Sequence, residues 1–325
     1  MPYKHNQAKR KKYKKKQSHR SDWSAYNRSL KLRGDFTLWL SADAIEAWYE
    51  QDRVYDGNGT PNLYSDMAII AVHEIRQIFK LPLRQTEGFI NSIFKMLKIE
   101  LRCPSYSVLS KRLKKLIIDT PFYRYAHKDT CEIKSIAIDS SGLKICGQDE
   151  WHEEKYGKNT KKDWRKRHIS VDDNNIIQTS VLTSSNTQDT SMVNNLIEPI
   201  TSKVKCFVAD KAYDNNKCYR KVRRKFPNAD VVIPPQKNSV YDKANEFHRN
   251  RNIEEVKCYG AMGWQKLRHY GKRNNSELAI QRYKKILGNK MHSRDFARQK
   301  LESQIGCGIL NKMMAITLEE IRQAA

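Results

Sequence analysis

The chain has 325 residues, of which 61 are Lys or Arg and 36 are Asp or Glu, so its formal net charge is +25. This length suits roughly two domains of about 150 residues each, and 39% hydrophobic residues are enough for a folded core. The longest apolar run, residues 67–72, is far shorter than the roughly 18 residues of a membrane span, and the basic N-terminus lacks a signal-peptide apolar stretch. Seven Cys without a CxxC pair fit reduced thiols in a cytoplasm. We expect no membrane partner, and a polyanion, most simply nucleic acid, as the natural one.

Residues 1–20 form a basic arm with nine Lys or Arg and no acid. A segment of this composition cannot bury enough apolar surface to fold alone, so we expect it to be disordered. Lys11 and Lys12 lie near its centre, and we predict that they contact DNA phosphates. The alternative interpretation is a tail that only increases solubility.

Residues 21–130 have the pattern of a helical region that binds DNA. Apolar residues recur at helical spacing in four segments after residue 35. Helix-capping residues precede three of these segments: Ser41, Ser65 and Ser105. The last two predicted helices are short, are joined by a brief turn and end in a basic face that includes Lys111 and Arg112, which suggests a helix-turn-helix. We predict DNA contacts for Lys111 and Arg112, and a plain solvated face is the alternative.

From residue 131 the pattern changes to strands with helices between them. Strand patterns cover residues 133–145, 164–171, 176–182, 205–209 and 229–233. Helical patterns cover residues 192–200 and 217–226 and begin again near residue 276. Three strands in hairpin order, followed by helix, strand, helix and strand, predict an α/β domain with a mixed sheet over residues 131–325.

Three acidic residues stand out by their positions in this pattern. Asp139 lies inside an apolar strand, Asp210 follows another strand directly, and Glu277 opens a C-terminal helix. A carboxylate in an apolar strand is costly unless it is paired or bound to a cation, and hard divalent ions prefer oxygen ligands. Such carboxylates suit phosphodiester chemistry with bound metal. The alternative for each of them is a carboxylate that is bonded only to backbone N–H groups.

A fourth pattern surrounds Glu277. Tyr270, Arg273 and Lys284 stand at offsets from Glu277 that share one face of a helix. An acid flanked by Arg and Lys on such a face can hold a metal ion and bind phosphate together.

The string Tyr-x2-Arg-x3-Glu-x6-Lys resembles the signature of bacterial insertion-sequence DDE transposases in residue and spacing. Residues 138–144 and 208–213 look like the first and second Asp motifs of that family. Residues 22–27 and 83–89 are similar to segments of the insertion-sequence-five group. The resemblance covers nearly the whole chain apart from residues 1–20.

The resemblance implies an RNase H-like catalytic core behind the helical DNA-binding region. It also implies that Asp139, Asp210 and Glu277 are the catalytic residues and bind Mg²⁺ or Mn²⁺. The order of strands and helices predicted above is independently compatible with such a core.

The implied activity is that of a transposase that binds the inverted-repeat ends of its mobile element, cuts DNA and joins the freed end to a target. Arg273 and Lys284 would bind phosphate near the cut, and Tyr270 would pack beside it or contact it. The implied partners are double-stranded DNA, as element ends and target, and further copies of the chain in a homodimer or higher synaptic complex. The implied location is the bacterial cytoplasm, with the nucleoid.

Two other functions stay open at the level of sequence. One is a DNA-binding regulator or an inactive transposase remnant without catalysis, and the other is an RNase H-like nuclease that cuts without joining. Among nearby polar residues, Asp214 is the poorer ligand candidate because it lies outside the apolar strand, and His168 is expected to be structural.

Overall fold

The computed structural model describes residues 22–51, 62–116, 132–145, 164–241 and 247–324. The basic arm with Lys11 and Lys12 therefore lies outside the described residues. In the described ranges, no helix is both long and apolar enough to cross a membrane.

Five helices form the N-terminal part of the described chain. They are α2 (Trp23–Leu32), α3 (Ala42–Glu46), α4 (Asp66–Phe79), α5 (Leu83–Met96) and α6 (Tyr106–Lys115). The predicted caps of α3, α4 and α6 are confirmed, because the side chains of Ser41, Ser65 and Ser105 accept backbone N–H bonds from the first turns of these helices. Each cap satisfies one of the N–H groups that the first turn of a helix leaves without an intrahelical partner.

The predicted mixed sheet is also confirmed. Its strands are β2 (Ile136–Lys144), β3 (Trp164–Asp172), β4 (Ile177–Ser184), β6 (Cys206–Val208) and β7 (Asp230–Val232). Their order is β4-β3-β2-β6-β7, with β2, β3 and β4 antiparallel and with β6 and β7 parallel to β2. A separate parallel pair joins β1 (Glu132–Ile133) to β5 (Lys203–Val204).

Helices cover both faces of the sheet. They are α8 (Val193–Ile197), α9 (Asn216–Lys225), α10 (Phe247–Leu267), α11 (Asn274–Ile286) and α12 (Phe296–Gln323). One face packs against α8 and α9, and the other packs against α10, α11 and α12. The sequence patterns did not predict α10, in which Gly260 has φ 69° and breaks the helical path.

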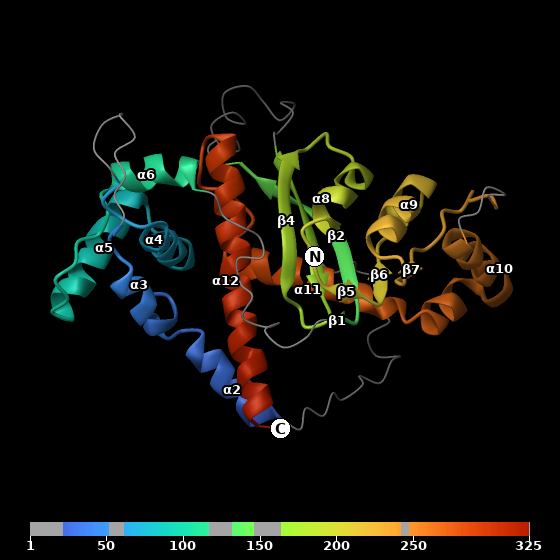
Figure 1. The fold of residues 1–325 in the computed structure, drawn as a ribbon, viewed down its shortest axis with the longest axis horizontal. Coiled ribbons are helices and arrows are strands. Elements are labelled where there is room, and N and C mark those ends of the chain that lie inside the picture. Colours follow the sequence, from blue (N-terminus) through green and yellow to red (C-terminus); the bar gives the residue numbers. More distant parts are fainter. Residues whose placement is uncertain (1–21, 52–61, 117–131, 146–163, 242–246, 325) are drawn as a thin grey trace, which may run out of the picture.

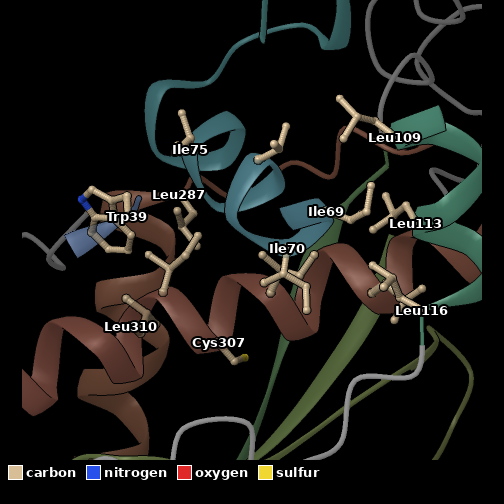
Figure 2. Packing of buried hydrophobic residues seen from close by; sticks show 14 of the residues in the cluster. Trp39, Ile69, Ile70, Ile75, Leu109, Leu113, Leu116, Leu287, Cys307 and Leu310 are labelled. Carbon is tan, nitrogen blue, oxygen red and sulfur yellow. The ribbon is translucent and has the colours of Figure 1, made fainter. Parts of the chain in front are cut away.

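One buried cluster joins the N-terminal helices to the sheet. In Figure 1, α12 stands between the two parts, and it contacts α2, α4 and α6 as well as β4. Figure 2 shows Ile69 of α4 and Leu113 of α6 packed over α12, which contributes Cys307 and Leu310. The described helices and the sheet thus share one core. The boundary predicted at residue 130 therefore stays a prediction that the two parts of the chain differ in function.

A close contact between three elements fixes α11 on the sheet. The guanidinium carbon of Arg167, a residue of β3 that is 1% exposed, lies 3.5 Å from the ring centroid of Tyr283 on α11. The same ring is in close contact with Gly306 of α12, where an added Cβ would lie 2.6 Å from Cε2 of Tyr283. The contact therefore requires a residue without a side chain at position 306.

We predict opposite effects for two Gly→Ala changes inside helices. Gly306→Ala should lower the free energy of unfolding by about 1–3 kcal/mol, because the methyl group overpacks the Tyr283 ring. Gly88→Ala is the control, since a Cβ at Gly88 of α5 meets nothing within 4 Å. It should raise stability by roughly 0.5–1 kcal/mol through helix propensity. Urea unfolding of both variants tests this prediction, and stabilisation by Gly306→Ala would contradict it.

Candidate active site

Asp139 lies in the middle of β2, on the face of the sheet that α11 covers. Its strand neighbours Ile136 and Ile138 are fully buried in the cluster with α8 and α9, so the strand alternation turns Asp139 to the opposite side. The Asp139 carboxylate accepts a 2.8 Å hydrogen bond from the backbone N–H of Ser140. Burial raises the pKa of Asp139, and the neighbouring acids Asp210 and Glu277 raise it further.

Asp210 reaches the same side of the sheet from the next strand. Ala137 of β2 is paired in parallel with Val208 of β6, and Asp139 and Asp210 each lie two residues further on. Since side chains two residues apart share a face, both carboxylates point to the side of α11. Asp210 also caps a short 3-10 helix by accepting the N–H of Ala212.

Arg273 connects the third acid to the first. Its guanidinium forms an ion pair with Glu277 in the first turn of α11 and lies 3.6 Å from Oδ2 of Asp139. The side chains of Asp139 and Arg273 are about one-fifth exposed, and that of Glu277 is 42% exposed. The geometry therefore brings together all three acids predicted from the sequence, with a cation between two of them.

The predicted single helical face is wrong for its first two members. Tyr270 and Arg273 lie in a separate 3-10 helix, which leads into α11 at Asn274. Tyr270 and Arg273 still lie side by side, and the Arg273 guanidinium carbon is 5.8 Å from the centroid of the Tyr270 ring. Behind it, the ring of Trp264 lies at 5.3 Å, and burial raises the pKa of Tyr270 to about 12. Tyr270 thus acts as a support beneath Arg273.

Lys284, the last residue of the predicted pattern, lies on α11 two turns after Glu277. Its side chain is exposed, and partial burial together with the nearby Arg167 cation lowers its pKa.

The donor set can be tested for its fit to a divalent metal ion. In the part of the chain that the structure describes, no three His, Cys, Asp or Glu side chains approach closely enough to hold an ion. The chemistry of the acids fits Mg²⁺ or Mn²⁺ nevertheless, because Asp139 is desolvated beside two other carboxylates and a cation would relieve that repulsion. The positive charge of Arg273 offsets part of the repulsion among the carboxylates. The three acids therefore have the charge and the oxygen ligands that a divalent ion needs.

A second polar cluster on the other side of β2 was missed by sequence reasoning. Oδ1 of Asp189 lies 2.8 Å from Nζ of Lys166 and 3.2 Å from Nδ1 of the buried His168. Burial opposes ionisation of Asp189, yet hydrogen bonds from His168, Lys166 and Ser140 outweigh it and lower the pKa to about 2. Because Ser140 follows Asp139 directly, the cluster braces the strand at the candidate site. Lys166 and His168 lie two residues apart on β3 and so share a face of the strand, a spacing that could have indicated a polar cluster there.

Two further predicted residues lie on α6, far from these acids in sequence. Lys111 is exposed. Arg112 donates a 2.8 Å hydrogen bond to the Tyr64 carbonyl and forms an ion pair with Asp66, so its guanidinium is already used within the protein.

Asp214 and His168 have structural partners, as expected. Asp214 is buried and accepts bonds from the Gln236 N–H, the Ser239 hydroxyl and Arg249. His168 Nε2 lies 3.0 Å from the Thr183 hydroxyl.

Comparisons with known proteins identify a family for the chain. A family model described as "Transposase DDE domain" matches residues 131–312, which is more than half of the chain, and a second with the same description matches residues 31–148. A solved cryo-EM structure of a piggyBac transposase synaptic complex with hairpin DNA is similar, with 10% identity and a TM-score of 0.41. That similarity covers 90% of this chain and 77% of the other.

We predict a pH-dependent effect of Asp189→Asn on stability. The ionised carboxylate stabilises the folded state at every pH above its unfolded pKa of about 4, and this contribution disappears as the pH falls towards its folded pKa of about 2. At about pH 7 the variant should lose about 1–3 kcal/mol, as expected for buried donors left without their charged partner. Urea unfolding from neutral pH down to about pH 3 measures the difference from wild type. A difference that stays constant below about pH 4 would contradict the assignment.

Proposed function

Because the chain belongs to the transposase DDE family, we propose that it binds the inverted-repeat ends of its own mobile element and catalyses metal-dependent cleavage and strand transfer. Membership makes it a DDE-type DNA transposase, and this family generally uses divalent metal ions. The observation that carries the proposal is the position of Arg273 between Asp139 and Glu277, with Asp210 on the same side of the sheet.

We further propose that the core is RNase H-like. In support, Asp139 lies on the middle strand β2, Asp210 follows the neighbouring strand β6, and Glu277 lies on a helix over the same face. We also propose that the chain belongs to the insertion-sequence-five group, which the similarity of residues 22–27 and 83–89 to segments of that group supports. The contacts of Arg273 with Tyr270 and Glu277 are consistent with a shared role for the members of the signature string.

In this proposal the three carboxylates hold Mg²⁺ or Mn²⁺. Such an ion supplies activation of the attacking oxygen and stabilisation of the leaving oxygen in phosphodiester cleavage and transfer. The chain itself orients the DNA. Arg273 would leave its ion pairs with Asp139 and Glu277 and donate hydrogen bonds to the phosphate at the cut. The ring of Tyr270 would limit the directions in which the Arg273 side chain can turn. Lys284 adds a point charge two helical turns after Glu277 on α11. No side chain needs to attack the DNA, so none is assigned as a nucleophile.

Double-stranded DNA is the proposed partner outside the active site. The basic arm with Lys11 and Lys12 and the exposed Lys111 of α6 supply charge for the phosphate backbone. Arg112 can join them only by leaving Asp66, so we expect it to contribute less than Lys111. A homodimer or higher oligomer that pairs the two element ends, working at the nucleoid, completes the proposal.

The carboxylates should be needed for catalysis and dispensable for binding. We predict that Asp139→Ala, Asp210→Ala and Glu277→Ala each lower Mg²⁺-dependent cleavage of element-end DNA on the order of 100-fold or more, because the metal loses a ligand. Binding to the same DNA in EDTA should stay near wild type, since Lys and Arg supply the affinity. Asp43→Ala, an exposed acid on α3, is the matched control. Near-normal strand transfer by a triad variant would remove that residue from the site.

Arg273 should act through its forked guanidinium. Arg273→Lys keeps the charge but loses bidentate geometry, so we predict a loss of cleavage and joining of about 10- to 100-fold, equivalent to a charged hydrogen bond of about 1.5–3 kcal/mol. Lys285→Ala, an exposed neighbour on α11, serves as the control and should keep wild-type rates. Wild-type rates for Arg273→Lys would leave its ion pairs as structural contacts only.

A further inference from the structure

The most basic helix that the structure describes is α9, which neither the arm nor the active site includes. Six of its ten residues are Lys or Arg and none is acidic. Its opposite side is anchored, because Cys218, Tyr219 and Val222 are at most 1% exposed and belong to the cluster beneath the sheet. The orientation of the helix is thus fixed, and its basic residues are turned outwards.

Three of these residues form a straight line. Lys217, Lys221 and Arg224 stand at positions i, i+4 and i+7, so they follow one another along a single helix face, and we call them the α9 stripe. Over the described residues, no carboxylate lies within ion-pair distance of any of the three. Like charges at i and i+4 repel one another by a few tenths of a kcal/mol. An uncompensated stripe is therefore suited to an external polyanion.

The helix that carries the stripe follows the candidate active-site residue Asp210 closely in the sequence. The helix begins at Asn216, six residues after Asp210, and α8 lies beside it (Figure 1). A groove of about 680 Å³ lies at its first turns, and its lining includes Thr190, Ser191, Lys217 and Lys221, together with Asp214, which is paired with Arg249. Hydroxyl and ammonium donors that line one groove are the chemistry that binds phosphate oxygens.

The dimensions fit a nucleic-acid backbone. Seven helical residues separate the ends of the stripe, which corresponds to about 10 Å. A strand of duplex DNA carries one phosphate per 3.4 Å of helix axis, so more than one phosphate lies alongside this length.

We propose that the α9 stripe binds the sugar–phosphate backbone of duplex DNA outside the segment held at Asp139 and Asp210. This surface is distinct from α6, and it lies on the opposite face of the sheet from α11. The proposal rests on the proposed function for the identity of the nucleic acid as DNA. The stripe adds affinity that does not depend on base sequence.

The test uses the full chain and a labelled duplex of arbitrary sequence, in EDTA so that catalysis does not enter. Lys221→Gln/Arg224→Gln removes two charges with little change in helix propensity. Lys31→Gln/Lys300→Gln removes two exposed charges on α2 and α12 and is the matched control. Fluorescence anisotropy at several salt concentrations gives the slope of log K against log salt, and thermal melting checks that both variants fold.

Each phosphate contact contributes about −0.9 to that slope, so the α9 variant should have a slope shallower by about 1.8, whereas the control should keep the wild-type slope. An unchanged slope in the α9 variant, or an equal change in the control, would overturn the inference and leave the stripe as a solvated face. Neither outcome bears on the cleavage assays of the Asp139→Ala, Asp210→Ala and Glu277→Ala variants, which test the proposed function separately. Failure of the wild-type chain to bind any duplex would instead overturn the proposed function and this inference together.

Discussion

The Asp139 carboxylate, held half-buried in the middle of a sheet, is the constraint around which this protein is arranged. A charge in that position is unfavourable unless positive groups or donors surround it. The chain provides these from two directions: the Ser140 N–H within the strand and Arg273 from the turn before α11. Two further acids lie close by and raise the pKa of Asp139 rather than lowering it. Such an arrangement is unfavourable for a purely structural ion pair and favourable for a site that exchanges cations.

The position of α11 is fixed by packing rather than by its charged residues. Tyr283 contacts both Arg167 of β3 and Gly306 of α12, so the helix cannot shift along the sheet without losing these contacts. Glu277 and Lys284 lie on either side of Tyr283 along the same helix. The position of Glu277 over the two Asp residues is thus set by a buried aromatic ring, and the exposed side chains near the ends of the helix remain able to change partners.

Local patterns in the sequence were sufficient for the caps, the strands and the three acids. Ser65 and Ser105 lie where a capping hydroxyl is needed, and Asp139 stands out because an acid interrupts an apolar strand. The features that the sequence did not predict depend on distant partners or on the backbone path. Asp189 meets Lys166 only through folding, Arg112 finds Asp66 46 positions away, and α10 has no regular apolar stripe because Gly260 breaks its path. The separation of Tyr270 and Arg273 from α11 is likewise a backbone detail that spacing alone cannot reveal.

The central position of α12 has a consequence for how the protein is made. This helix is the last described element of the chain, yet it packs against α2, α4, α6 and β4. Contacts between residues so far apart in sequence form late, because the intervening chain must first be ordered. During synthesis the N-terminal helices and the sheet each leave an apolar surface uncovered until residues 296–323 have emerged from the ribosome. The N-terminal helices and the sheet therefore depend on one helix for their shared core, and a truncation within α12 would uncover both surfaces at once.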